Sequence, residues 1–177
     1  MPGGEQGLVQ VYTGEGKGKT TAALGLVLRA AGWGLRSLVI QFMKQQQTGE
    51  RQALARFLAL CVTLEQFGRA GFLRRGQALP EDVALARQGL ERARAALKSS
   101  DYDIVVLDEV NTAVDFGLLA EQEVLELIEL KPASVELVLT GRGAPAGLLA
   151  RADLVTRMVE EKHPYRVGVG ARRGIDY

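Results

Sequence analysis

The 177-residue chain has one cysteine, one histidine and only 6% aromatic residues, so several kinds of site are excluded. Cys61 on its own cannot form an internal disulfide or a multi-cysteine metal site, and its apolar surroundings favour a buried small hydrophobe. His163 on its own excludes a multi-histidine metal centre, and its neighbour Pro164 favours a structural loop residue over a catalytic base. The sequence therefore offers little support for thiol or imidazole chemistry.

Long apolar runs and a strong charge bias are also missing. No run approaches the roughly 18 apolar residues of a membrane span, and Met1 to Gly7 lack the pattern of a secretory signal. A net charge of +1 creates no global field for nucleic acid, and the cluster Arg69, Arg74 and Arg75 is interpreted as a solvated face. With 47% hydrophobic residues, we expect a single soluble domain over residues 1–177 in a reducing cytoplasm, with neither nucleic-acid nor membrane partners.

Short apolar runs alternate with helical patterns along the chain. The runs are mostly continuous, which is typical of strands in a sheet that is covered on both faces. This order predicts a three-layer α/β fold with a mostly parallel central sheet, whose ligands bind at the carboxyl ends of the strands. The expected strands are Leu8 to Tyr12, Ser37 to Phe42, Val62 to Phe67, Ile104 to Leu107, Val135 to Thr140 and Leu154 to Met158. The expected helices are Thr20 to Ala31, Glu50 to Leu60, Glu81 to Lys98, Glu121 to Leu130 and Ala146 to Ala150.

Three segments do not follow this alternation. The stretches Met43 to Gly49 and Gly68 to Leu79 each follow a strand, which places them at the binding edge. Each is either a mobile lid or wall for a second substrate, or a simple surface connection. The tail from Glu160 to Tyr177 has little periodicity, so it either frays or folds back over the site.

The strongest motif is TGEGKGKT at Thr13 to Thr20, between the first expected strand and the first expected helix. Its three glycines allow backbone N–H groups to converge on phosphate oxygens, and the helix N-terminus adds a favourable dipole. Lys19 supplies a positive charge, and Thr20 can offer its hydroxyl to Mg²⁺. Thr13 replaces the first glycine of the usual GxxxxGK[ST] pattern, but the strand–loop–helix order favours a phosphate cradle over a plain helix cap.

Two further strands end in polar residues. Asp108 and Glu109 follow one of them, where an acid can hold Mg²⁺ and a following glutamate can align or deprotonate an attacking group. The alternative is that these acids cap a helix that begins near Asn111. Thr140 and Arg142 follow another strand, where a guanidinium can bind phosphate oxygens in bidentate fashion or pair with a surface carboxylate.

Together these motifs resemble the ATP:corrinoid adenosyltransferases of the cobalamin pathway, of the CobA/CobO/BtuR type, from about Leu8 to Tyr177. The phosphate loop and the acidic strand are common to many NTPases, whereas TGRGAP and the tail motifs are much more specific. The resemblance implies a RecA-like P-loop NTPase fold. The matching segments are TGEGKGKTTAA at 13–23, QFMK at 41–44, TGE at 48–50, VVLDEVNTAVDFGLL at 105–119, VLTGRGAP at 138–145, and EKHPY with GARRGIDY in the tail.

The resemblance implies transfer of the 5′-deoxyadenosyl group of ATP to Co(I) of a reduced corrinoid, with triphosphate as the leaving group. Because Co(I) is already a strong nucleophile, the protein mainly has to align it with the ribose 5′-carbon and stabilise the triphosphate. In this role the catalytic residues are Lys19, Asp108 and Glu109, and Mg²⁺ is held by Thr20, Asp108 and Glu109. The expected nucleotide contacts are Gly14, Glu15, Gly16, Lys17, Gly18, Lys19, Thr20, Thr21 and Arg142.

This sequence departs from the family pattern on the corrinoid side. Family members line the corrin with aromatic residues after the third strand, which selects Phe72, with Phe67 nearby. Leu73 and Arg74 stand where a tryptophan often follows, and Gln45 stands where a glycine usually follows the QFMK lysine. The customary N-terminal extension that covers the site is also not found before the first expected strand.

The resemblance also implies partners. The corrinoid is cob(I)alamin, cobinamide or cobyrinic acid a,c-diamide, the reductant is a flavin-type reductase, and the chain forms a homodimer. The alternative function is a RecA-like ATPase or nucleotide-dependent switch, in which Glu109 orients a water molecule.

Overall fold

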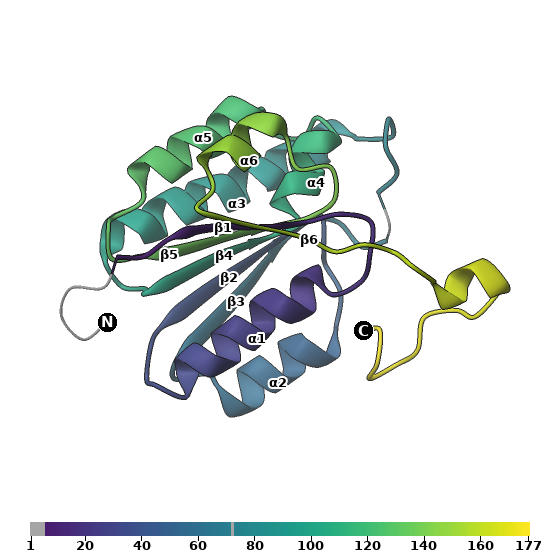
Figure 1. The fold of residues 1–177 in the computed structure, drawn as a ribbon, viewed down its shortest axis with the longest axis horizontal. Coiled ribbons are helices and arrows are strands. Elements are labelled where there is room, and N and C mark those ends of the chain that lie inside the picture. The colour runs from purple at the N-terminus through teal and green to yellow at the C-terminus, as the bar shows by residue number, and fades with distance from the viewer. Residues whose placement is uncertain (1–5, 72) are drawn as a thin grey trace.

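The computed structural model describes residues 6–71 and 73–177 and contains one six-stranded sheet (Figure 1). The strands are β1 (Val9–Thr13), β2 (Ser37–Phe42), β3 (Val62–Phe67), β4 (Ile104–Asp108), β5 (Glu136–Thr140) and β6 (Leu154–Arg157). They lie in the order β3–β2–β4–β5–β1–β6, and every pairing between them is parallel. The predicted α/β class is therefore confirmed, and the six expected strands are found with end shifts of no more than one residue.

Helices cover both faces of this sheet (Figure 1). The helices on one face are α1 (Lys19–Ala31) and α2 (Gly49–Phe57), and those on the other are α3 (Pro80–Ser99), α4 (Val110–Asp115), α5 (Glu121–Leu130) and α6 (Ala146–Arg151). The five expected helices are present, although α2 ends three residues early. Sequence periodicity does not reveal α4 because six residues make less than two helical turns. Among the described residues, no helix is long and apolar enough to cross a membrane.

The core explains why the sheet is covered on both faces. All six residues of β2 and all five of β4 are buried, including the polar Gln41 and Asp108. On the α3 side, Ala86, Leu90, Ala93 and Leu97 form a buried apolar stripe along one face of the helix, while Val83 is only partly buried. Central strands of this kind read as continuous apolar runs because both of their faces are dry.

The second core, beneath α1 and α2, includes Val27, Val39 and Val106. Cys61 packs against this core but is only half-buried, so its predicted burial is met in part. Because all the strands are parallel, their carboxyl ends meet at one edge of the sheet. The polar residues that follow β1, β2, β4 and β5 are thereby brought to the same edge.

Candidate active site

The loop between β1 and α1 has a backbone that only glycine adopts without strain. Gly14 and Gly18 have φ values of 99° and 119°, and a Cβ added to Gly14 would lie 2.4 Å from the carbonyl oxygen of Met158. Gly18 is the N-cap of α1 and carries no side chain to cap the helix. The first N–H groups of α1 are therefore available to an anion at this end of the helix.

Lys19, the first residue of α1, is folded back over this loop. Its Nζ donates hydrogen bonds to the carbonyl oxygens of Gly14 at 2.6 Å and Gly16 at 2.7 Å, and the residue is only 7% exposed. Burial lowers the pKa of Lys19, and the charge of Glu109 opposes that shift. The ammonium group thus lies inside the loop that the sequence assigns to phosphate.

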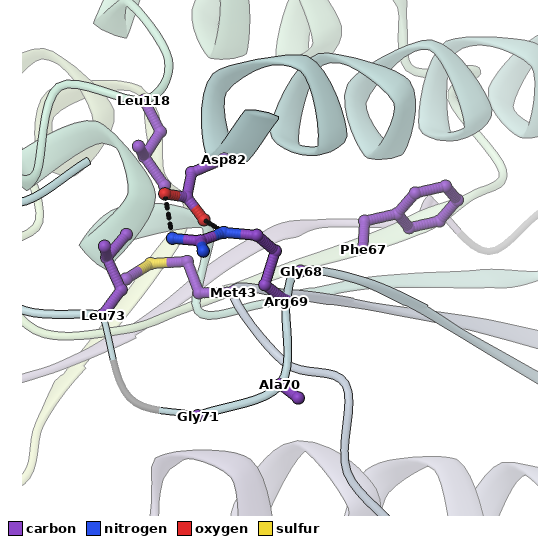
Figure 2. Close-up of a pocket in the computed structure, with 9 residues that line it drawn as sticks. All are labelled: Met43, Phe67, Gly68, Arg69, Ala70, Gly71, Leu73, Asp82 and Leu118. Atoms are coloured by element: carbon purple, nitrogen blue, oxygen red, sulfur yellow. Dashed lines mark hydrogen bonds and ion pairs between the residues drawn. The ribbon is translucent and has the colours of Figure 1, made fainter. Parts of the chain in front are cut away.

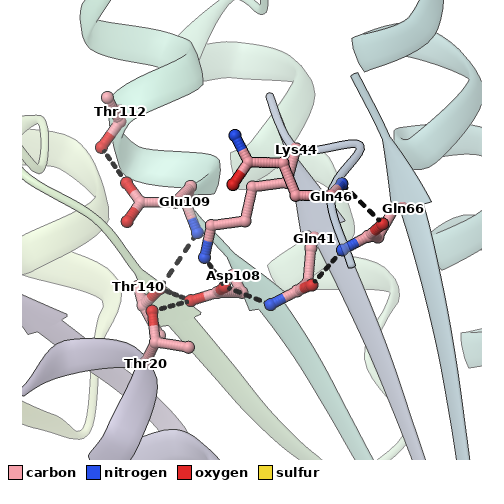
Figure 3. Close-up of polar contacts among 9 residues, drawn as sticks. All are labelled: Thr20, Gln41, Lys44, Gln46, Gln66, Asp108, Glu109, Thr112 and Thr140. Atoms are coloured by element: carbon pink, nitrogen blue, oxygen red, sulfur yellow. Dashed lines mark hydrogen bonds and ion pairs between the residues drawn. The ribbon is translucent and has the colours of Figure 1, made fainter. Parts of the chain in front are cut away.

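Asp108, at the end of β4, is the centre of a buried polar cluster (Figure 3). Its Oδ1 accepts hydrogen bonds from the hydroxyls of Thr20 at 2.8 Å and Thr140 at 2.7 Å. Its Oδ2 accepts from Gln41 Nε2 at 3.0 Å and Lys44 Nζ at 2.7 Å. Burial alone would raise the pKa of Asp108, but the Lys44 charge and these hydrogen bonds hold the pKa below its ordinary value.

Glu109, the N-cap residue before α4, has a left-handed backbone conformation with φ 66°. Its N–H donates to Thr140 Oγ1 at 3.0 Å, and its carboxylate accepts from Thr112 Oγ1 at 2.6 Å. A non-glycine residue in this region stores about 1 kcal/mol or more of strain, which persists only when the surroundings hold it in place. The short helix of the capping alternative is present, but the Glu109 side chain makes no capping hydrogen bond to the helix backbone, and Asp108 instead accepts from the Thr20 hydroxyl.

Arg142, in the loop after β5, spans the cleft to the phosphate loop. Its backbone N–H donates to Thr112 Oγ1 at 3.0 Å. Its guanidinium lies 3.5 Å from the Glu15 carboxylate and 3.4 Å from the Glu15 carbonyl oxygen. The alternative of a carboxylate partner for Arg142 therefore holds in this structure, but that carboxylate belongs to the phosphate loop itself.

A cleft of about 1060 Å³ brings most of the predicted residues together. Gly14 lies in an adjoining pocket, and the buried Asp108 does not line the cleft itself. Phe72, the predicted corrin contact, lies outside the described residues. The predicted residues that line the cleft are Glu15, Gly16, Lys17, Gly18, Lys19, Thr20, Thr21, Glu109 and Arg142.

The C-terminal tail forms one wall of this cleft, so it folds back over the site. Asp176 accepts a hydrogen bond from Lys17 in the phosphate loop, and Lys17 Nζ also donates to the Ile175 carbonyl oxygen at 3.3 Å. A short 3₁₀ helix, η1 (Pro164–Val167), begins after His163. The His163 Nδ1 accepts from the N–H of Tyr165 at 3.2 Å, which is the structural role that the sequence predicts.

The residues present fit a Mg²⁺ ion bound together with phosphates. No group of three His, Cys, Asp or Glu side chains in the described ranges could enclose a metal. Mg²⁺ commonly keeps several waters and takes one or two carboxylates plus substrate phosphates, so a full protein cage is not needed. The Thr20 hydroxyl and the Asp108 carboxylate supply hard oxygen ligands of this kind beside the phosphate loop.

Sequence reasoning does not select Lys44 or Gln41 as site residues, although both contact Asp108 directly. Their signal is the polar end of an otherwise apolar strand, the same signal that identifies Asp108. Arg75 also lines the cleft, in the segment after β3 that the sequence places at the binding edge, so its interpretation as merely part of a solvated face is wrong. Phe116 lines the cleft as well but carries no strand-end signal.

Comparison with known proteins agrees with this geometry. The profile of the family "ATP:corrinoid adenosyltransferase BtuR/CobO/CobP" matches residues 5–177. A corrinoid adenosyltransferase of Sinorhizobium sp. is 37% identical over 175 residues, which cover 98% of this chain and 81% of that protein. The corrinoid adenosyltransferases of Pseudomonas aeruginosa and Escherichia coli K12 are 36% and 35% identical, covering 98% of this chain and 85% and 87% of theirs. The chain therefore belongs to the ATP:corrinoid adenosyltransferase family, whose members are enzymes that transfer an adenosyl group from ATP to a corrinoid.

Proposed function

We propose that this chain transfers the 5′-deoxyadenosyl group of ATP to Co(I) of a reduced corrinoid and holds the triphosphate as the leaving group. The observation that carries the proposal is the convergence of Lys19, the uncapped start of α1 and the buried Asp108 on one side of a large cleft. A cleft of about 1060 Å³ also leaves room for a second substrate beside the nucleotide.

The chemistry asks little of the protein beyond alignment and charge stabilisation. The electron pair of Co(I) forms the bond to C5′, the C5′–O bond breaks, and its electrons pass to the triphosphate oxygen. No proton has to move in this step, so a site without an imidazole base is sufficient. The growing negative charge is stabilised by Lys19, by the N–H groups at the start of α1, and by Arg142 at the cleft edge.

In this proposal Mg²⁺ is bound at Thr20 and Asp108, with Glu109 as the second acidic neighbour. When bound, the ion neutralises part of the triphosphate charge. Thr20 and Thr140 orient the Asp108 carboxylate through its Oδ1, and Thr140 also fixes the Glu109 backbone. The two acids are thereby held at fixed positions relative to the phosphate loop.

The second-substrate side of the proposed site is formed by the segments that follow β2 and β3. A small cavity of about 40 Å³ there is lined by Met43, Phe67 and Leu118, among other residues (Figure 2). The Arg69 guanidinium donates two hydrogen bonds to the Asp82 carboxylate at the start of α3, from Nε to Oδ1 at 2.7 Å and from Nη2 to Oδ2 at 2.8 Å. This bidentate contact anchors the segment after β3. An anchored wall with Met43, Phe67 and Leu118 as its apolar part supports contact with a large macrocycle.

Product analysis tests the proposed function. The protein is incubated with MgATP and chemically reduced cob(I)alamin, and the products are examined for a cobalt–carbon bond and for triphosphate. Both are expected in equal amounts. Release of orthophosphate without a corrinoid, and with no adenosylated product, would instead support the ATPase alternative and overturn the transferase.

The choice among cobalamin, cobinamide and cobyrinic acid a,c-diamide stays a prediction, as do the flavin-type reductase, the homodimer and the cytoplasmic location. Comparing kcat/KM for the three reduced corrinoids would identify the preferred substrate. Sedimentation of the purified chain would test the homodimer.

A further inference from the structure

A chain of amide side chains leads away from Asp108 in one fixed direction (Figure 3). The Asp108 carboxylate only accepts hydrogen bonds, so Gln41 must turn its Nε2 toward it, at 3.0 Å. The Gln41 Oε1 then faces the next strand and accepts from Gln66 Nε2 at 2.9 Å. Gln66 is therefore left with its own Oε1 free to accept from a further donor.

That second oxygen holds the segment between β2 and α2. Gln66 Oε1 accepts from the backbone N–H of Gln46 at 3.2 Å and from Arg51 Nη1 at 3.0 Å. The same segment, residues 43–49, also carries Lys44, whose Nζ binds Asp108 directly. The segment is thus attached to the Asp108 cluster at two points, by Lys44 and by the Gln41–Gln66 pair.

The direction of this chain cannot easily be reversed. Gln41 is 0% exposed, so water cannot replace either of its partners. Turning its amide over would place Oε1 against the Asp108 carboxylate and set two NH₂ groups against each other. Leaving a buried polar group unsatisfied is costly, which favours the arrangement that pairs both the Asp108 oxygen and the Gln41 oxygen with a donor.

The start of the segment is held in an unusual backbone conformation. Met43 has φ 58°, and its N–H donates to the Phe67 carbonyl oxygen at 2.9 Å. Its side chain lines the small cavity on the second-substrate side (Figure 2). A left-handed non-glycine residue persists only where its surroundings hold it, so the position of Met43 depends on the contacts of the segment.

We propose that Gln66 is a positioning residue for the corrinoid. Through Gln41 and the N–H of Gln46, it holds residues 43–49 in a fixed place relative to Asp108, so that the wall begun by Met43 is ready for the second substrate. This inference rests on the proposed function. It predicts an effect on corrinoid binding rather than on ATP, because the β1–α1 loop makes none of these contacts with Gln66.

Gln66→Met tests the inference, because it keeps the length of the side chain and removes both its donor and its acceptor. The KM for cob(I)alamin at saturating MgATP is expected to rise about 10-fold, while the KM for ATP changes less than about 2-fold. Hydrogen exchange of the Gln46 backbone N–H is expected to become about 10-fold faster without any substrate present. The control is Gln122→Met on α5, where an exposed glutamine outside the site is replaced and neither quantity should change.

Two more variants keep the test decisive. Gln66→Glu retains the acceptor, so the Gln46 amide should exchange within about 3-fold of the wild-type rate. Arg51→Met removes only one donor to Gln66, so a smaller rise in the cob(I)alamin KM of about 3-fold is expected even if Gln66→Met fails to fold.

Equal rises in both KM values, or an unchanged exchange rate in Gln66→Met, would overturn the inference. If the wild-type protein forms no adenosylated corrinoid, the proposed function fails instead. In that case the exchange rates still decide whether Gln66 holds the segment.

Discussion

The Nζ of Lys44 lies 2.7 Å from Oδ2 of Asp108, so the acid at the centre of the site already has a cationic partner. The Asp108 side chain is 1% exposed and the Lys44 side chain is 27% exposed, which shelters the pair from solvent on one side. Burial lowers and Asp108 raises the pKa of Lys44, and the net effect is a raised pKa. Removing this cation should therefore affect stability as well as activity.

Lys44→Met is expected to lower the free energy of unfolding by about 2–4 kcal/mol, because Asp108 keeps only neutral donors in a buried site. Chemical denaturation at neutral pH measures the change. Lys44→Arg, which keeps the positive charge, should recover at least half of the loss. A Lys44→Met protein as stable as the wild type would show that the pair contributes nothing to folding.

Lys19→Ala is expected to reduce kcat for adenosyl transfer by about 10²–10³-fold, because one preorganised donor to the leaving group is lost. Single-turnover formation of the cobalt–carbon bond measures the effect. Lys98→Ala, an exposed lysine near the end of α3, is the control and should retain wild-type turnover. Near-normal transfer by Lys19→Ala would contradict the placement of the triphosphate in the β1–α1 loop.

The hydroxyl of Thr140 is shared between two acidic residues, since it donates to Asp108 and accepts from the N–H of Glu109. Thr140→Val keeps the shape and the strand preference but loses both hydrogen bonds. We expect about a 10–100-fold lower kcat/KM for ATP, because the Glu109 N–H is left without a partner, at a cost of about 1–3 kcal/mol, and Asp108 Oδ1 keeps only the Thr20 hydroxyl. Thr156→Val, on the exposed strand β6, is the matched control. Equal kinetics for the two variants would rule out this role for Thr140.

Asp82 provides a prediction for acidic pH. Its hydrogen bonds with the Arg69 guanidinium, and then one from the Leu79 N–H, hold the pKa of Asp82 below its ordinary value of 3.8, against an opposing effect of burial. The stabilisation is complete above that ordinary value and is lost as the pH falls through the lower pKa of the folded state. The free energy of unfolding should therefore decrease more steeply below about pH 4 in the wild type than in Asp82→Asn.

The same variant should be about 1–2 kcal/mol less stable than the wild type at pH 6, since the charged hydrogen bonds to the half-exposed Arg69 are weakened. Denaturation at a series of pH values measures both effects. Asp101→Asn, which replaces an exposed aspartate, should leave the slope unchanged. Parallel curves for Asp82→Asn and the wild type would exclude a role for Asp82 in acid stability.

Much of the fold could be predicted because its signals are local. Continuous apolar runs identify β2 and β4, since strands that are buried on both faces contain few polar residues. The short helix α4 could not be predicted from periodicity, because it has only six residues. The half-exposed Cys61 shows a related limit, since an apolar neighbourhood in the chain does not specify where the edge of the core lies.

The sequence by itself determined the order of strands and helices, the glycine loop with Lys19 and Thr20, and the acids at the end of β4, because each depends on neighbours in the chain. Only the tertiary structure decided that Lys44 binds Asp108, that Gln41 joins Asp108 to Gln66, and that the C-terminal tail reaches Lys17. The contacts of Lys44, Gln41 and Gln66 follow from the strand order, in which β2 lies between β3 and β4, and the tail reaches Lys17 because β6 lies beside β1. Residues far apart in the chain become partners there because neighbouring parallel strands bring their carboxyl ends together.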